Sequence, residues 1–119
     1  MPVTHVDYDV LSALQDVMEG EYPVLLDTFI SDSELRVQQL HHALAGQAAG
    51  LPELGLAAHS FKGSSGNLGA VHLAELCRQL EERALQKQLS GVAELVQKIE
   101  SEFLTVRRLF NVERQRFSD

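Results

Sequence analysis

A histidine with a lysine three residues later stands in a glycine-rich stretch of the sequence, AHSFKGSSGNLGA. Positions three and four residues apart share a face of a helix, so one side presents Gly55, His59, Lys62, Gly63 and Gly66. An unprotonated imidazole nitrogen is a nucleophile, and a nearby ammonium can balance negative charge that arrives there. Phosphoryl transfer to nitrogen requires in-line access and charge compensation, which these residue types can supply.

The glycines of this stretch demand a reason, because each glycine inside a helix costs about 1 kcal/mol relative to alanine. Gly63 and Gly66 leave the surface beside His59 without side chains, which gives a large partner room to approach. Gly69 is expected to end the helix in a left-handed conformation. Two other interpretations stay open on residue types alone: glycines that only let helices pack closely, and an ordinary surface histidine.

The elements that must position this stretch are helices, because apolar residues recur at helical spacing along most of the chain. Proline and glycine mark the breaks between them. The pattern predicts five helices. The first is short, over about 7–18 with Asp7 as N-cap, and the second has Pro23 in its first turn and an apolar stripe that ends at Leu44. The third runs from near Pro52 into the glycine-rich stretch, the fourth runs from about Val71 to Ala84, and the fifth has Ser90 as candidate cap and an apolar stripe that ends at Phe110.

Four long amphipathic helices joined by short loops favour an all-α fold, an antiparallel up-and-down four-helix bundle. The short additional N-terminal helix would cap one end, and residues 1–119 would form a single domain. The third helix is expected to turn a core stripe inward, made of Leu54, Ala58, Phe61, Ser65 and Leu68.

Composition narrows the classes of partner. A formal net charge of −7 argues against nucleic acid, and the arginines near the end of the chain are expected on a solvated helix face (Arg107, Arg108, Arg114, Arg116). No apolar run is long enough to span a bilayer, and no secretory signal is recognisable at the start. We therefore expect a cytoplasmic protein that binds no membrane. We also expect a monomer, because the apolar stripes of its four long helices can pack against one another.

The remaining histidines and the single cysteine suggest no second site. A di-metal bundle would need paired Glu-x-x-His motifs, and the sequence contains none. His41 and His42 are expected on the surface, His5 near a frayed terminus, and His72 near the start of the fourth helix. Cys77 falls on a core stripe, where a free cysteine behaves as a small hydrophobic residue. The chain is therefore expected to bind no metal or cofactor of its own.

The residues HSFKGSSGNLGA resemble the signature of histidine phosphotransfer (HPt) domains, and the expected bundle resembles their fold over essentially the whole chain. Among these domains the chain looks most like the free-standing ones of pseudomonads. The resemblance implies that His59 accepts a phosphoryl group, on Nε2, from the aspartyl phosphate of a hybrid-kinase receiver domain. His59 would then pass it to an aspartate of a response-regulator receiver. Lys62 would offset phosphate charge, and Gly63 and Gly66 would give the receiver room.

The resemblance also implies the residues around the histidine. HPt domains carry a Gln or Glu on the following helix that hydrogen-bonds the non-reactive imidazole nitrogen, and Glu81 corresponds to it here. An alternative for Glu81 is a solvated helix residue. Leu56, Ser60 and Arg78 are expected on the rim that a receiver contacts, and Mg²⁺ on the receiver itself. Phe61 departs from the usual leucine on the core side, where it should alter packing and not chemistry.

No glycine-rich nucleotide loop precedes a Lys-Ser/Thr pair, so we expect a phosphocarrier without kinase activity of its own. The competing hypothesis is a non-catalytic helical adaptor that docks on receiver or kinase domains and inhibits them. An adaptor would have no need for the set of His59, Lys62 and Gly63.

Overall fold

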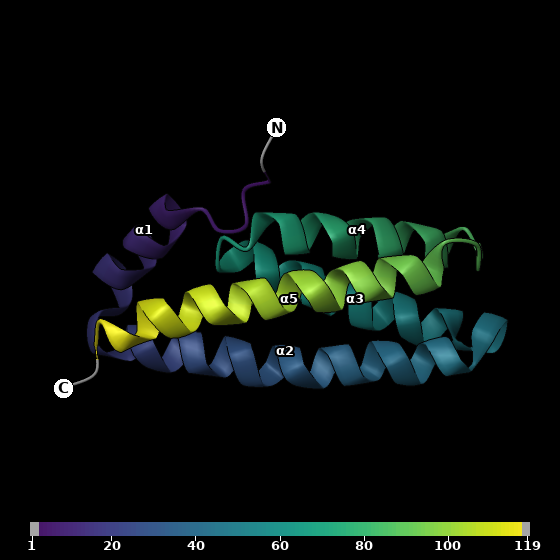
Figure 1. Ribbon diagram of the computed structural model, residues 1–119, viewed down its shortest axis with the longest axis horizontal. Helices are drawn as coiled ribbons and strands as arrows, with labels where there is room; N and C mark the ends of the chain where they lie inside the picture. Colours follow the sequence, from purple (N-terminus) through teal and green to yellow (C-terminus); the bar gives the residue numbers. More distant parts are fainter. Residues whose placement is uncertain (1–2, 118–119) are drawn as a thin grey trace.

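The four apolar stripes close into a helical bundle in the computed structural model, which describes residues 3–117 (Figure 1). α2 packs against α3, α3 against α4, α4 against α5, and α5 returns to α2. The predicted all-α four-helix bundle is confirmed, and no strand occurs between residues 3 and 117. The elements in chain order are α1 (Tyr8–Met18), a 3₁₀ turn (Glu19–Glu21), α2 (Tyr22–Ala45), a second 3₁₀ turn (Gln47–Gly50), α3 (Leu51–Asn67), α4 (Val71–Leu85) and α5 (Val92–Gln115).

Local sequence signals account for most helix ends. The Asp7 side chain accepts a hydrogen bond from the Asp9 amide at 3.0 Å, as expected of an N-cap, and Pro23 lies in the first turn of α2. The expectation that Ser90 caps the last helix is wrong. The residue before α5 is Gly91, which has a φ of +77° and no side-chain cap. This left-handed residue places Ser90 one position too early to cap the helix, and the Ser90 carbonyl accepts from the Arg83 guanidinium instead.

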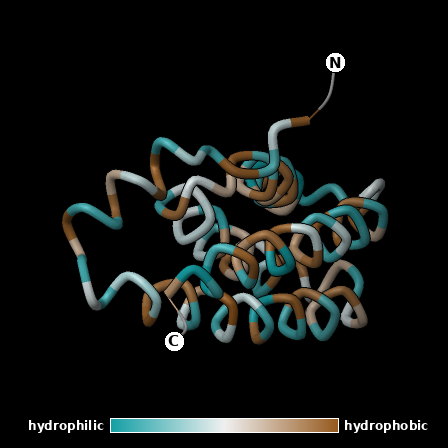
Figure 2. Tube along the Cα trace, turned by 60° about the vertical axis from the view of Figure 1, so that its left-hand side comes forward, coloured by the Kyte–Doolittle hydropathy of each residue, from teal (hydrophilic) through white to brown (hydrophobic). Residues whose placement is uncertain are grey.

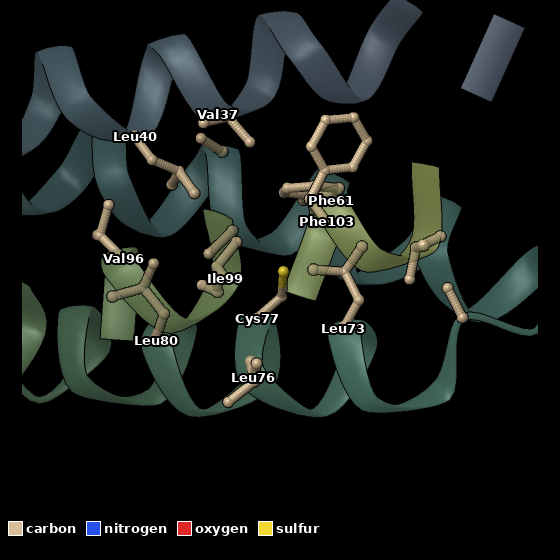
Figure 3. Packing of buried hydrophobic residues seen from close by; sticks show 14 of the residues in the cluster. Val37, Leu40, Phe61, Leu73, Leu76, Cys77, Leu80, Val96, Ile99 and Phe103 are labelled. Atoms are coloured by element: carbon tan, nitrogen blue, oxygen red, sulfur yellow. The ribbon is translucent and has the colours of Figure 1, made fainter. Parts of the chain in front are cut away.

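The core lies between the four long helices, each of which alternates hydrophobic and hydrophilic residues along its length (Figure 2). Phe61 on α3 reaches across to Phe103 on α5, with ring centroids 6.3 Å apart, and Leu73 and Cys77 of α4 pack beside them (Figure 3). Phe61 and Cys77 are fully buried, as their places on the core stripes predict. Burial raises the pKa of the Cys77 thiol to about 12, so it is not a nucleophile at neutral pH.

The N-terminal segment and α1 cover the end of the bundle where α3 turns into α4 (Figure 1). Gly69 has the predicted left-handed conformation, with a φ of +76°, and the Asp7 amide donates to its carbonyl at 2.8 Å. A Cβ on Gly69 would also lie 2.8 Å from the Asp7 carbonyl oxygen, so this glycine both ends α3 and lets the N-terminal segment approach.

The expectation of a frayed terminus at His5 is wrong. His5 Nδ1 lies 2.7 Å from the carboxylate of the buried Glu102 on α5, and this contact holds the segment before α1 against the bundle. None of the helices between residues 3 and 117 is long and apolar enough to cross a membrane.

Candidate functional site

α3 has the two faces that its sequence predicts. All five residues of the expected core stripe are buried, whereas the His59 side chain is 66% exposed and lies on the outer surface. The stripe consists of Leu54, Ala58, Phe61, Ser65 and Leu68. Because both sides belong to one rigid helix, core packing of α3 fixes the position from which the imidazole projects.

Glu81 of α4 contacts the imidazole directly. His59 Nδ1 lies 2.6 Å from Glu81 Oε2, so the interpretation of Glu81 as a merely solvated residue is wrong. An ionised carboxylate can only accept hydrogen bonds, so the imidazole donates from Nδ1. The proton on Nδ1 leaves the lone pair of a neutral ring on Nε2.

Lys62 shares this carboxylate with His59. Its Nζ donates to Glu81 Oε1 at 2.6 Å, and the Glu81 side chain is only 17% exposed. The hydrogen bond from Lys62, followed by that from His59, holds the pKa of the Glu81 carboxyl below its usual value against the opposing effect of burial. In the free protein Lys62 is therefore bound to Glu81 and is not an isolated cation beside the imidazole.

The glycines of α3 divide into two kinds. A Cβ added at Gly63 or Gly66 would meet no atom within 4 Å, so neither glycine serves close helix packing. A Cβ on Gly55 would lie 3.1 Å from the Ala84 side chain, so Gly55 lies against α4, and it lines the same hollow as His59. The surface beside His59 is thus bare at Gly63 and Gly66, while Gly55 allows α3 and α4 to approach.

A shallow hollow of about 160 Å³ opens between α3 and α4 next to the imidazole. His59 and Glu81 line it together with Leu56 and Leu85, whose side chains are 73% and 75% exposed. Leu56 was expected on this rim. Leu85 was missed, although it lies one helical turn after Glu81 and on the same side of α4.

The other two expected rim residues are placed differently. Ser60 is exposed and lines a separate hollow on the α2 side of α3. Arg78 is exposed on α4, and its guanidinium is bound by Glu75 at 2.7 Å and Glu82 at 2.9 Å. These carboxylates raise the pKa of Arg78 further and hold its side chain along its own helix.

Three other histidines lie on α2 and near the start of α4. His41 and His42 are exposed as expected and pair with Glu100 and Glu53, and His72 lies half-buried near the start of α4. Within residues 3–117 no three His, Cys, Asp or Glu side chains are arranged to hold a metal ion. What this surface offers chemically is one oriented imidazole with an outward nucleophilic nitrogen.

Comparisons with known proteins agree with this geometry. The chain is similar to histidine-containing phosphotransfer protein B (HptB) from Pseudomonas aeruginosa PAO1, with 52% sequence identity, a TM-score of 0.89, and coverage of 98% of this chain and 99% of that protein. The expected similarity to a free-standing pseudomonad protein is confirmed. A rice protein assigned as a histidine-containing phosphotransfer protein matches with a TM-score of 0.83 over 93% of this chain and 80% of that one, and at 20% identity it supports the fold alone.

The search of curated proteins gave no match. The model of the Hpt domain family matches residues 24–109, which include α3, α4 and the whole contact among His59, Lys62 and Glu81. Family, fold and bundle length agree, and the chain belongs to the Hpt domain family.

Proposed function

We propose that this chain is the histidine phosphotransfer component of a multistep phosphorelay and that His59 carries the phosphoryl group. It receives the group from the aspartyl phosphate of a hybrid-kinase receiver domain and delivers it to the aspartate of a response-regulator receiver. The observation that carries the proposal is the 2.6 Å contact between His59 Nδ1 and Glu81, in a chain of the Hpt domain family. That contact leaves Nε2 as the nucleophile on an exposed face.

The proposed transfer forms one bond to phosphorus and breaks another. The Nε2 lone pair attacks phosphorus, the N–P bond forms, and the bond from phosphorus to the aspartyl oxygen breaks, which releases the aspartate carboxylate. The ring gains positive charge as its lone pair is consumed, and the Glu81 carboxylate stabilises that charge through the proton on Nδ1. Delivery to the second receiver is the reverse of these steps, with that receiver's aspartate as nucleophile.

The receiver supplies the rest of the reaction centre. We assign the Mg²⁺ that binds the phosphoryl oxygens to the receiver's own carboxylates, which are the ligands this ion prefers. The bare surface at Gly63 and Gly66 allows a folded partner to approach Nε2 in line. In this proposal the chain is a carrier that holds a phosphoryl group between two partners and has no kinase activity of its own.

Transfer from phosphorylated receiver domains tests the proposal. Purified protein is incubated with a panel of receivers labelled on aspartate, and acid-labile phosphate on the bundle is measured. We expect label on the wild type, none on His59→Ala, and undiminished label on the control His41→Ala, because His41 is exposed and pairs with Glu100 of α5 and not with a residue of α3. If receivers bind the wild type and never label it, the chain is the non-catalytic adaptor and the carrier hypothesis is wrong.

A further inference from the structure

A second hollow lies on the α2 side of the proposed site, and one arginine lines it. This hollow of about 210 Å³ is bounded by Arg36 and Gln39 of α2 and by Glu53, Leu56, Ala57 and Ser60 of α3. Leu56 lines both this hollow and the one that contains His59. The two hollows therefore flank the outer face of α3, one toward α4 and one toward α2.

The Arg36 side chain is available to a partner. It is half-buried, and its Nη1 donates to Gln39 Oε1 at 3.0 Å. Of the lysines and arginines on α2, α3 and α4, Lys62 and Arg78 are bound by carboxylates and Arg83 by a backbone carbonyl. Arg36 forms no ion pair within residues 3–117, and Glu53 across the hollow pairs with His42.

A partner that reaches His59 is close enough to contact this arginine as well, because Leu56 lines both hollows. A stable protein interface buries roughly 800 Å² on each side, and packed helix axes lie about 8–10 Å apart. A footprint of that size centred on His59 extends beyond α3 onto both of its neighbours, α2 and α4. The bare surface at Gly63 lets the partner sit low enough on α3 to contact side chains on either side.

Charge indicates what Arg36 binds. This chain carries a net charge of −7, and a receiver that holds Mg²⁺ presents carboxylates around its aspartate. Two acidic surfaces repel one another unless a cation lies between them, and an arginine binds a carboxylate with two parallel hydrogen bonds. We propose that Arg36 and the hollow between α2 and α3 form a second receiver contact, which binds an Asp or Glu side chain on the rim of the receiver. This inference rests on the proposed function for the identity of the partner.

Binding of unphosphorylated, Mg²⁺-loaded receiver domains tests the inference without requiring transfer. The probe is the receiver of the panel that binds the wild type most tightly. We expect Arg36→Glu to raise its Kd about tenfold or more at low salt and Arg36→Gln to raise it less. The loss should shrink at 1 M salt, where the Debye length is about 3 Å. Arg36 is not a core residue, and circular dichroism checks that both variants keep their helices.

The matched control is Arg108→Glu, which makes the same charge change at an exposed position on α5. If receiver affinity depends on the position of the arginine and not on the net charge of the chain, the Kd of this variant should stay within about twofold of wild type. Replacement of one rim carboxylate of the receiver by arginine should restore binding to Arg36→Glu. Equal Kd values for Arg36→Glu and Arg108→Glu would overturn the inference, as would slower transfer by Arg36→Glu at an unchanged Kd. Label on the bundle reports the proposed function separately, and a panel in which no receiver binds would overturn both.

Discussion

At the scale of single residues, Glu81 divides its two oxygens between His59 and Lys62, each at 2.6 Å. The carboxylate is mostly buried, so it depends on these two partners to stay ionised and in place. Lys62 therefore affects the imidazole through Glu81 before any phosphoryl group arrives. This differs from the role that the family resemblance implies, in which the ammonium acts on the phosphoryl group itself.

A double-mutant cycle separates these two roles of Lys62. We expect Lys62→Met to slow phosphotransfer in the wild-type background and to have little further effect beside Glu81→Gln. The predicted coupling is about 0.5–3 kcal/mol, the usual range for residues in one network. Lys62→Met should also raise the pKa of Glu81 toward its ordinary value, because the strongest interaction that lowers this pKa is lost. Rates come from labelled receivers and the pKa from carboxyl NMR. Independent, multiplicative losses would mean that Lys62 acts on the phosphoryl group directly.

At the scale of elements, the two sides of α3 have opposite effects on stability. One side packs into the core of the bundle, and the other carries glycines, which make the helix less stable. Phe61 and Leu54 are fully buried on the first side, while Gly63 and Gly66 lie open on the second. Nothing in the free protein fills the space above these glycines, so an alanine would fit there. Packing within the free protein does not require glycine at these two positions, whereas the proposed approach of a receiver supplies a reason for both.

Gly63→Ala should therefore stabilise the protein and impair its function. We expect the free energy of unfolding to rise by up to about 1 kcal/mol, because alanine is the better helix former. Phosphotransfer should slow, and Gly63→Gln should slow it more, because each side chain enters the space that the receiver occupies. Gly20→Ala is the control, since Gly20 also has open space around it but lies beside α1 at the end of the bundle. Loss of stability in Gly63→Ala, or transfer at the wild-type rate, would contradict this account.

The same division explains how much could be predicted from the sequence. The helices, Asp7 and Gly69 as helix ends, and the outward side of His59 depend on spacing within one segment, and all were predicted. The contact of His5 with Glu102 and the hollow lined by Arg36 depend on how two helices are rotated and offset against each other. The spacing of apolar residues along one helix contains no information on its offset from another helix. Glu81 was identified only through the family resemblance, and its second contact, with Lys62, was not foreseen.

At the scale of the whole molecule, three ion pairs join α2 to α5 at intervals of seven residues. Asp27 pairs with Arg114 at 3.0 Å, Glu34 with Arg107 at 3.6 Å, and His41 with Glu100 at 3.0 Å. Each step of seven along α2 is matched by a step of seven backwards along α5, which is the register of an antiparallel helix pair with heptad spacing. Carboxylates of α2 bind two of the arginines near the end of the chain, Arg107 and Arg114.

The Asp27–Arg114 pair should weaken as the salt concentration rises, because both side chains are partly exposed and salt screens their attraction. Double-mutant cycles with Asp27→Asn and Arg114→Gln should give a coupling of about 0.2–1 kcal/mol at low salt that falls toward zero at 1 M salt. Urea unfolding supplies the free energies. An equal coupling at both salt concentrations would show that a hydrogen bond, and not charge, joins α2 to α5 at this pair.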